Sequence, residues 1–301
     1  MSAIVVSFMR ILLVLISALC AAVPVASFSA TDSISALEKS SARPAAAMMD
    51  NSFLLEEAYN QEPGVVQHIL NVVHTARRRA GTDDRDLSLV FSQEWPIFTQ
   101  THQFAYSIPF TFTEAGGRDD RGLEDITLNY RYQFWLETET RPAFAPSFSL
   151  ILPTGDEAKG LGNDTVGYQV TLPASKIVSD RWSLHGNAGV TFFPEVSGHD
   201  LVSYSLGASA IYAVRPNFNF MLEVVADFEE GVNDFGGTAR AVSAVISPGF
   251  RYAINHPNDA QTVVGLAVPI GITADAPDYG VFLYASFEHF FLRPKSSGSG
   301  K

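Results

Sequence analysis

Cysteine is almost absent from this 301-residue chain, which contains only Cys20, near its beginning. Once the segment around Cys20 is removed, no disulfide can form in the remainder and no cysteine is left to bind a metal. Basic residues are also few, because 20 Lys and Arg stand against 32 Asp and Glu, for a net charge of −12. A protein with this charge and no basic stripe is a poor nucleic-acid binder, so we expect no nucleic-acid partner.

Long hydrophobic runs are missing beyond residue 29, although 47% of all residues are hydrophobic. A membrane-spanning helix needs about 20 consecutive apolar residues, which the later part of the chain never reaches. Its apolar residues instead alternate with small or polar ones. A lipid-facing β-sheet distributes its apolar residues in this way.

The first 29 residues have the composition of a secretory signal peptide. Arg10 is the only charged residue before Asp32, and residues 11–25 form an apolar run that is followed by small residues. We expect cleavage near residues 27–29. A membrane-anchor helix is the alternative, but the apolar run is short for a span of about 20 residues.

Several segments alternate between apolar and polar residues, and residues 103–113 do so most clearly. Every even-numbered residue in this segment is large and apolar, and the odd-numbered ones are small or polar. Residues 125–134 repeat the pattern, with Asp, Asn, Arg and Gln on the polar side. A β-strand projects successive side chains to opposite faces, so each segment has one apolar and one polar face. The residues expected to contact lipid are Phe104, Tyr106, Ile108, Phe110, Leu128, Tyr130 and Tyr132.

Twelve segments of this kind can be placed along the chain. A series of such strands behind a secretory signal indicates a β-barrel in a bacterial outer membrane, and these barrels close with an even number of antiparallel strands. We therefore predict an all-β fold, an antiparallel up-and-down transmembrane β-barrel of about 12 strands. The predicted strands are residues 64–76, 86–97, 103–113, 124–136, 143–152, 166–177, 182–193, 201–213, 218–228, 241–253, 261–272 and 280–291.

The predicted connections between these strands alternate strictly between short and long. The short ones are residues 98–102, 137–142, 178–181, 214–217 and 254–259. The long ones, rich in Gly and Asp, are residues 77–85, 114–122, 153–165, 194–200, 229–240 and 273–279. Outer-membrane barrels have short periplasmic turns and longer outer loops, so we expect both termini to be periplasmic.

The segments outside the barrel differ from it in character. Residues 30–62 are polar and Ala-rich at first, and residues 53–59 predict a short helix. We expect this N-terminal segment to lie in the periplasm near the barrel rim; entry into the lumen as a plug is the alternative. The barrel itself is assigned to residues 63–292, and residues 293–301 form a polar tail without a structural signal.

Several short motifs resemble one family of outer-membrane proteins. These motifs are residues 59–62, 64–68, 122–128, 152–156 with Gly160 and Gly162, 175–176 and 182–189. Together they are similar to the outer-membrane β-barrel family named for the MetA pathway of phenol degradation, of transporter type. The resemblance covers about residues 56–291 and implies a barrel that passes small, hydrophobic or aromatic molecules. The polar tail beyond Phe291 departs from the family, whose barrels usually finish on an aromatic residue.

The polar face of the predicted strands points charged and polar side chains into the barrel. Such groups either line a lumen that selects small solutes or pair with one another and fill it. Barrels of eight strands are filled by side chains and those of 16 leave an open channel, so both interpretations stay open. The lumen-lining candidates are Glu94, Asp125, Asn129, Arg131, His185, Asn187, Glu223, Asp227, Arg251 and Glu288.

Little in the sequence indicates catalysis. His185 and Asn187 lie two residues apart on one predicted strand, a spacing by which outer-membrane lipases orient a base. Such enzymes also need a serine nucleophile beside the histidine, facing the lipid. The other histidines show no spacing typical of a metal site, and we expect no catalytic residue, metal or cofactor.

Three functional hypotheses follow, in order of preference. The first is a passive channel in the outer membrane for small, hydrophobic or aromatic molecules. The second is a closed barrel with a structural or surface-interaction role, whose acid-rich outer loops contact divalent cations or lipopolysaccharide. The third is a lipid-modifying enzyme that depends on His185. In each case the expected partners are outer-membrane lipids and lipopolysaccharide, and the sequence does not identify the solute.

Overall fold

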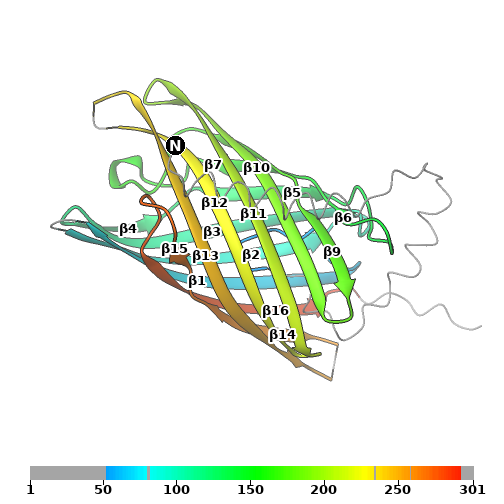
Figure 1. Ribbon diagram of the computed structural model, residues 1–301. Helices are drawn as coiled ribbons and strands as arrows, with labels where there is room; N and C mark the ends of the chain where they lie inside the picture. The colour runs from blue at the N-terminus through cyan, green and yellow to red at the C-terminus, as the bar shows by residue number, and fades with distance from the viewer. Residues whose placement is uncertain (1–51, 80–81, 234, 258, 293–301) are drawn as a thin grey trace, which may run out of the picture.

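The computed structural model describes residues 52–79, 82–233, 235–257 and 259–292, and the expected signal peptide and C-terminal tail lie outside these residues. Among them, no helix is long and apolar enough to cross a membrane. The described chain forms one antiparallel sheet that closes into a barrel, because its first strand pairs with its last (Figure 1). The strands are β1 (Val65–Arg79), β2 (Thr82–Pro96), β3 (His102–Ala115), β4 (Arg118–Leu123), β5 (Ile126–Tyr132), β6 (Ala143–Phe144), β7 (Ser147–Leu152), β8 (Gly167–Thr171), β9 (Ala174–Ser179), β10 (Trp182–Val196), β11 (His199–Arg215), β12 (Phe218–Val232), β13 (Thr238–Asn255), β14 (Gln261–Ala267), β15 (Ile270–Gly271) and β16 (Tyr279–Phe290), with one 3-10 turn, η2 (Glu157–Lys159).

The prediction of a 12-stranded barrel is confirmed, although four of the strands are interrupted. The interrupted strands are β4 with β5, β6 with β7, β8 with β9, and β14 with β15. Pro173 and Pro269 mark two of the breaks, because proline has no N–H to donate to the ladder. Hydrogen bonds bridge both places: Ala145 N–H donates to the Pro173 carbonyl (3.3 Å) and Val268 N–H to the Pro248 carbonyl (3.0 Å). The breaks therefore do not open the wall.

The two rims of the barrel differ, and each is named here by what it carries. β1 begins and β16 ends at the terminal rim. The opposite rim, called the loop rim, carries the connections 153–166 and 272–278 and the tips of several hairpins.

Four of the predicted long loops are β-hairpins instead. Residues 77–85, 114–122, 194–200 and 229–240 lie largely in strands that extend to the loop rim. Gly116 (φ 59°) and Gly117 (φ 79°) turn the second hairpin in the left-handed conformation that suits a two-residue turn between twisted strands. The predicted alternation of short and long loops is therefore wrong. Gly- and Asp-rich sequences are compatible with an exposed hairpin as well as with a loop, so composition alone could not separate the two.

Side chains alternate between the two faces of the wall. On β5, Tyr130 and Tyr132 are 39% and 37% exposed, whereas Arg131 between them is 3% exposed. The outer face of the other strands carries exposed large apolar side chains, which is the surface a lipid-facing wall presents. Examples are Leu70, Phe91, Phe112, Phe148, Phe220, Leu222, Tyr252, Val264, Leu283 and Phe287.

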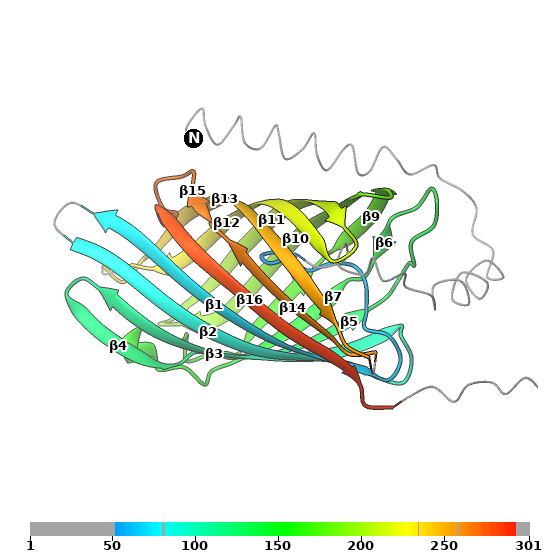
Figure 2. The same ribbon diagram turned by 90° about the horizontal axis from the view of Figure 1, so that it is seen from below.

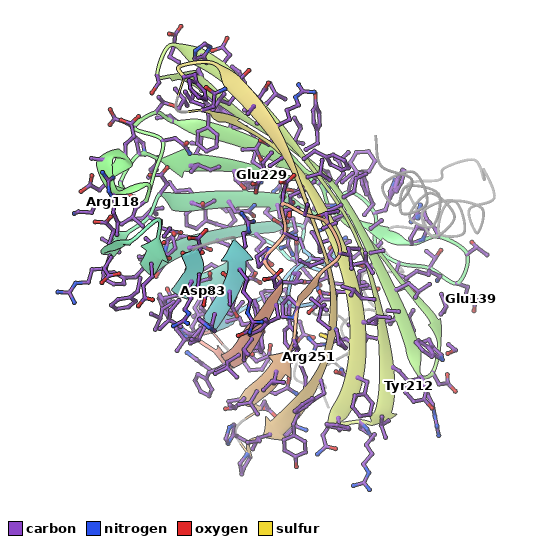
Figure 3. All side chains as sticks on the ribbon, turned by 60° about the vertical axis from the view of Figure 1, so that its left-hand side comes forward. Asp83, Arg118, Glu139, Tyr212, Glu229 and Arg251 are labelled. Carbon is purple, nitrogen blue, oxygen red and sulfur yellow. The ribbon has the colours of Figure 1, made fainter. Side chains whose placement is uncertain are left out.

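Aromatic rings gather near the terminal rim. Trp182 packs on Tyr212, with ring centroids 4.9 Å apart, and Trp95 packs on Phe291 at 5.3 Å. Figure 3 shows Tyr212 at this end of the barrel and Asp83 at the opposite end. Aromatic side chains prefer the boundary between lipid and water, so this arrangement fits a membrane interface.

Residues 52–62, here called the inner segment, precede β1 and lie inside the barrel rather than beside its rim (Figure 2). Residues 53–59 form bends and irregular backbone without the short helix that their sequence predicts. The backbone N–H groups of Phe53, Leu54 and Ala58 donate to side chains of the wall. Contacts with the wall therefore replace the local hydrogen bonds that a helix would need.

Single cysteines introduced on β3 test the two faces, since no cysteine occurs after Cys20. We expect spin labels at 106, 108 and 110 to collide with oxygen in the lipid, and labels at 107, 109 and 111 to be shielded from it. A label at Phe98, which is 96% exposed in a turn at the terminal rim, provides the aqueous control. Equal oxygen accessibility at all six strand positions would contradict a lipid-facing wall.

Candidate functional site in the barrel interior

The barrel interior is the candidate site, and amide side chains hold the inner segment there near the terminal rim. Gln61 donates from Nε2 to Glu94 Oε2 (3.2 Å) and to Gln67, and its backbone N–H donates to Gln103 Oε1 (2.7 Å). Gln103 also donates to Glu94 (3.0 Å). Gln67 and Gln103 are buried, and buried polar groups are costly without partners. Polar side chains of β1, β2 and β3 thus find their hydrogen-bond partners in one another and in a single residue of the inner segment.

Farther along the inner segment, hydrogen bonds from β9 and from the chain after β5 hold the backbone of Ala58 and Asn60. Ser175 Oγ accepts the Ala58 N–H (2.8 Å), and Gln133 Nε2 donates to the Ala58 carbonyl (2.8 Å). Gln133 Oε1 accepts the Asn60 N–H (3.2 Å). A single wall side chain, Gln133, therefore uses both ends of its amide on the inner segment.

Arg131 supplies the main charge contact with the inner segment. Its side chain is 4% exposed, and its guanidinium lies 3.7 Å from Glu56 Oε2 and 3.5 Å from Glu57 Oε1. It also donates to the Tyr59 carbonyl (3.2 Å). Ser147 Oγ donates to Glu56 (3.0 Å). A buried cation is stable only when paired and hydrogen-bonded, so Arg131 depends on the inner segment as much as the segment depends on it.

His185 lies between two serines under the inner segment. Its Nδ1 is 2.8 Å from Ser175 Oγ and its Nε2 is 3.1 Å from Ser183 Oγ. The edge of the Tyr59 ring faces it, with centroids 6.4 Å apart. Both serines are 0% exposed, so a lipid ester cannot reach either hydroxyl in this conformation. Within the described residues, no group of three or more His, Cys, Asp or Glu could hold a metal ion.

The start of the inner segment is held by β11 and β12. Glu223 Oε1 accepts the backbone N–H groups of Phe53 (3.1 Å) and Leu54 (2.9 Å). Ser52 Oγ donates to Ser209 Oγ (2.9 Å). Glu223 is 0% exposed, so its carboxylate meets protein rather than water at this level of the barrel.

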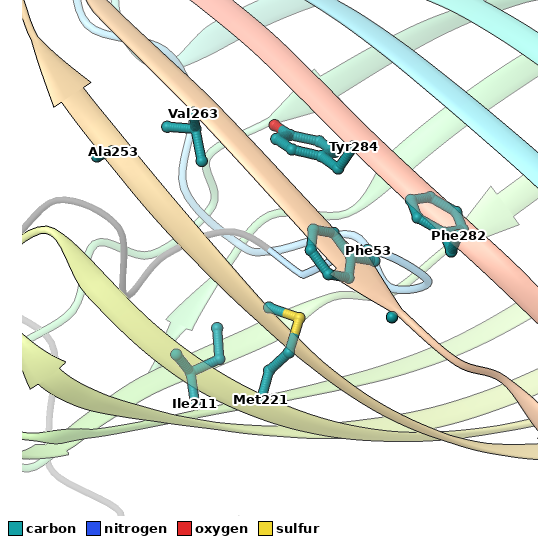
Figure 4. Close-up of a cluster of buried hydrophobic side chains, with 8 residues drawn as sticks. Phe53, Ile211, Met221, Ala253, Val263, Phe282 and Tyr284 are labelled. Atoms are coloured by element: carbon teal, nitrogen blue, oxygen red, sulfur yellow. The ribbon is translucent and has the colours of Figure 1, made fainter.

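The interior also has an apolar side, which contacts Phe53. The Phe53 ring lies 5.3 Å from the rings of both Phe282 and Tyr284 on β16 (Figure 4). Arg251 lies over the Phe53 ring, with its Cζ 5.7 Å from the ring centroid. The interior is therefore divided into a polar side and an apolar side. The buried apolar cluster consists of Phe53, Ile211, Met221, Ala253, Val263, Ala267, Phe282 and Tyr284.

A cavity of about 640 Å³, here called the rim cavity, lies near the loop rim. Asp227 and Glu229 contribute carboxylates to its lining, and Glu230 lies 3.5 Å from Arg240. Its other lining residues are mostly uncharged and polar or apolar. They include Asn163, Gln169, Thr191, Ser203 and Ser205. The rim cavity is large enough for a small solute.

Asp125 holds a loop rather than lining the middle of the lumen. Its Oδ1 accepts the Gly155 N–H (2.9 Å) and its Oδ2 accepts the Asn163 N–H (3.1 Å), which fixes the connection 153–166. On the surface of this loop, a hydrogen bond from Lys159 lowers the pKa of Asp156. Asp125 is thus a structural anchor at the loop rim.

The ten predicted lumen residues fall into groups that lie in different parts of the barrel. Glu94, Arg131, His185, Glu223 and Arg251 surround the inner segment.

The remaining predicted residues lie elsewhere on the wall. Asn129 donates to Ser149 Oγ (2.8 Å), Asp227 lines the rim cavity, and Glu288 is the register partner of Gln67. Asn187 lies on β10, two residues beyond His185. Among the described residues, Asn129, Asp227 and Asn187 make no hydrogen bond or ion pair with the inner segment.

The residues that sequence reasoning did not select are those of the inner segment itself. Phe53, Ala58 and Gln61 each contact side chains of the wall in the barrel interior. The available signal was an apolar stretch followed by Glu56 and Glu57, and a short amphipathic helix has the same pattern.

Arg131→Met tests whether this charge cluster holds the inner segment. The variant leaves two carboxylates without their cation, so we expect the segment's contacts to weaken by about 3 kcal/mol. Hydrogen exchange at the Ala58 amide would measure the loss of protection. Adding Glu56→Gln and Glu57→Gln should restore part of it, and Arg121→Met on an exposed hairpin is the control. Unchanged protection at Ala58 would show that the amide contacts alone are sufficient.

Solved structures include barrels of similar shape. The barrel is similar to the COG4313 outer membrane channel from Pseudomonas putida F1, with 14% identity, a TM-score of 0.62, and coverage of 77% of this chain and 97% of that one. The NanC porin covers 74% of this chain and 100% of its own at 11% identity, with a TM-score of 0.42. The translocator domain of the autotransporter NalP from Neisseria meningitidis covers 87% and 100% at 10% identity, with a TM-score of 0.48. Only the first is close enough to show a shared fold.

No curated protein matches the sequence. The family comparison does give a match, over residues 67–286, from near the start of β1 into the second half of β16. That stretch contains every strand of the ring, except for the outer ends of β1 and β16, and nine of the ten predicted lumen residues, all but Glu288. The chain therefore belongs to the family described as "Putative MetA-pathway of phenol degradation".

Proposed function

We propose that the protein is a passive channel for small molecules in the bacterial outer membrane, and that the inner segment sets the width of its lumen. The observation that carries this proposal is the content of the barrel. Charged and amide side chains line it, and residues 52–61 occupy it through noncovalent contacts only. A barrel built only as a scaffold can be filled by the side chains of its own strands. The similar barrel from Pseudomonas putida is described as an outer membrane channel, which agrees with this proposal.

The inner segment can leave its place without opening the wall. Barrel closure depends on the backbone ladder between β1 and β16, which runs from Val65 opposite Phe290 to Ala76 opposite Tyr279. The inner segment uses a separate set of hydrogen bonds, each of which stabilises its position by about 0.5–1.5 kcal/mol. Water that enters the lumen can replace these bonds. Displacement of the segment therefore costs much less than unfolding of the barrel.

The outer face supports a position in the outer membrane, where lipids surround the wall. Its exposed apolar side chains match the hydrocarbon layer, and the rings near the terminal rim match an interface. We place the terminal rim in the periplasm because the connections 153–166 and 272–278 and the protruding hairpins lie at the other rim. Charged hairpin residues such as Asp119 and Arg121 then lie at the level of lipopolysaccharide.

A closed barrel without conductance is the second candidate. The observation that favours it is the complete burial of Glu223 and Arg251 in the interior. A lipid-modifying enzyme has less support, because the hydroxyls beside His185 are inaccessible. Conductance measurements separate the first two candidates.

Replacing residues 53–59 by Gly and Ser at unchanged length should raise the unit conductance in planar bilayers several-fold, because the lumen loses the inner-segment side chains that fill it. Wild-type protein should show smaller or rarer conductance steps. A matched Gly and Ser replacement of the exposed turn residues 98–100 is the control and should behave as wild type. Absence of conductance in the 53–59 variant would support the closed barrel.

The carboxylates of the rim cavity should make the channel weakly cation-selective. Like charges at a mouth concentrate the opposite ion, and salt screens this effect over about 10 Å at 0.1 M. Asp227→Asn with Glu229→Gln, in the variant with residues 53–59 replaced, should therefore reduce cation preference at low salt. The reversal potential under a salt gradient measures it, with Asp83→Asn on an outer hairpin as the control. An unchanged reversal potential would show that these carboxylates do not control selectivity, and anion preference at low salt would assign control to Arg131 and Arg251.

A further inference from the structure

We propose that the apolar side of the interior is a binding site for an arylethylamine, a compound with an aromatic ring two carbons from an amine, and that Phe53 occupies this site in the present conformation. The inference rests on the proposed function, because a solute reaches this site only through the lumen. It goes beyond that function by identifying a place in the barrel and the chemistry that this place recognises.

The ring of Phe53 has aromatic partners on one strand. The ring of Phe282 lies nearly parallel to it, at 5.3 Å and an interplanar angle of 22°, and Tyr284 meets it at 5.3 Å and 40°. The Arg251 guanidinium lies over it, with Cζ 5.7 Å from the centroid. Offset aromatic pairs and a cation over a ring face both favour an aromatic occupant over an aliphatic one of similar size.

Two strand glycines provide the space for this ring. A Cβ on Gly265 of β14 would lie 2.4 Å from Phe53 Cζ, and a Cβ on Gly249 of β13 would lie 3.1 Å from Phe53 Cε2. Glycine weakens a strand interior and often marks a close approach by another group. The wall is therefore shaped to accept a six-membered ring at this position, and a larger residue at Gly265 would exclude one.

The Glu223 carboxylate accepts a hydrogen bond from the nitrogen that is linked to the ring. The backbone N–H groups of Phe53 and Leu54 donate to Glu223 Oε1, at 3.1 and 2.9 Å. Glu223 Oε2 is buried and accepts no hydrogen bond from the described residues, and the neighbouring Ser247 Oγ, on the register partner of Glu223, is also buried without a described partner. A buried carboxylate oxygen without a donor is costly, so this position favours a ligand with more than one donor.

The two halves of the site have a fixed spacing, which Phe53 itself defines. Its ring is joined through Cβ and Cα to the nitrogen that donates to Glu223, so the occupied atoms trace a phenyl ring, two carbons and a nitrogen. A free ammonium at the nitrogen position would bring three donors to Glu223 where the peptide nitrogen brings one. The smallest compound with this outline is 2-phenylethylamine.

Phe53 competes with such a ligand because its ring and its backbone nitrogen hold both positions of the site. Phe53→Ala removes the ring contacts that keep residues 53 and 54 against Glu223, so the segment can leave the nitrogen position to the ligand. The apparent affinity of a ligand falls in proportion to the fraction of molecules whose site is vacant. If Phe53 fills the site in about 90% of molecules, its removal should strengthen binding about tenfold. A larger occupancy would give a larger gain.

The test is isothermal titration of the purified full-length protein in detergent micelles with 2-phenylethylamine. We expect Phe53→Ala to bind it at least about tenfold more tightly than wild type. In the Phe53→Ala background, Gly265→Val should abolish the gain by filling the ring position, and Glu223→Gln should reduce it by removing the charge. Phe287→Ala, on the outer face of β16, is the matched control and should bind as wild type.

Two comparison ligands define the chemistry. Ethylbenzene lacks the amine and 2-cyclohexylethylamine lacks the aromatic ring, so both should bind the Phe53→Ala variant more weakly than 2-phenylethylamine. Equal binding of ethylbenzene would overturn the role of Glu223, and no gain on Phe53→Ala would overturn the site.

Conductance of the same Phe53→Ala protein in planar bilayers tests the proposed channel function separately from the binding site. Specific binding without any conductance would support the site and refute the channel. Conductance without specific binding would support the channel and refute the site.

Discussion

Every backbone N–H and C=O on a wall that faces lipid needs a partner within the protein, because the hydrocarbon layer offers no water. A closed ring of strands meets this demand, and the pairing of β1 with β16 completes the ring. The same demand explains why the proline breaks in the wall are bridged by neighbouring carbonyls such as those of Pro173 and Pro248. The apolar pattern and the turns fix the register of each strand, and register decides which side chains meet lipid and which face inward.

The interior has more freedom than the wall, because backbone pairing already maintains the barrel. One side carries amides, Arg131 and His185, and the other carries Phe282, Tyr284 and neighbouring apolar groups. The inner segment matches both sides: Phe53 meets the apolar side, and Gln61 meets the amides. A single stretch of chain therefore packs against both an apolar and a polar surface. This explains why it contains both apolar and polar residues.

The wall could be predicted from the sequence because its pattern is local. Tyr130, Arg131 and Tyr132 show the alternation within three residues, and a lipid surface enforces it on every strand. The composition around Gly116 and Gly117 predicts a loop, because exposed hairpin tips and exposed loops both favour Gly and Asp. The inner segment could not be placed, because the hydrogen bond from Phe53 to Glu223 joins residues 170 positions apart and no local period records it.

The joint between the inner segment and β1 has a consequence for assembly. Gly64, with φ 82°, lies against the end of β16, where a Cβ would come within 2.0 Å of the Leu292 carbonyl oxygen, and its own carbonyl accepts the Phe291 N–H (2.8 Å). The turn that directs the chain into the lumen is therefore also part of the seam at which the first and last strands meet. Insertion of the inner segment and completion of the cylinder become coupled events, so the order in which they occur decides whether the passage starts out filled or empty.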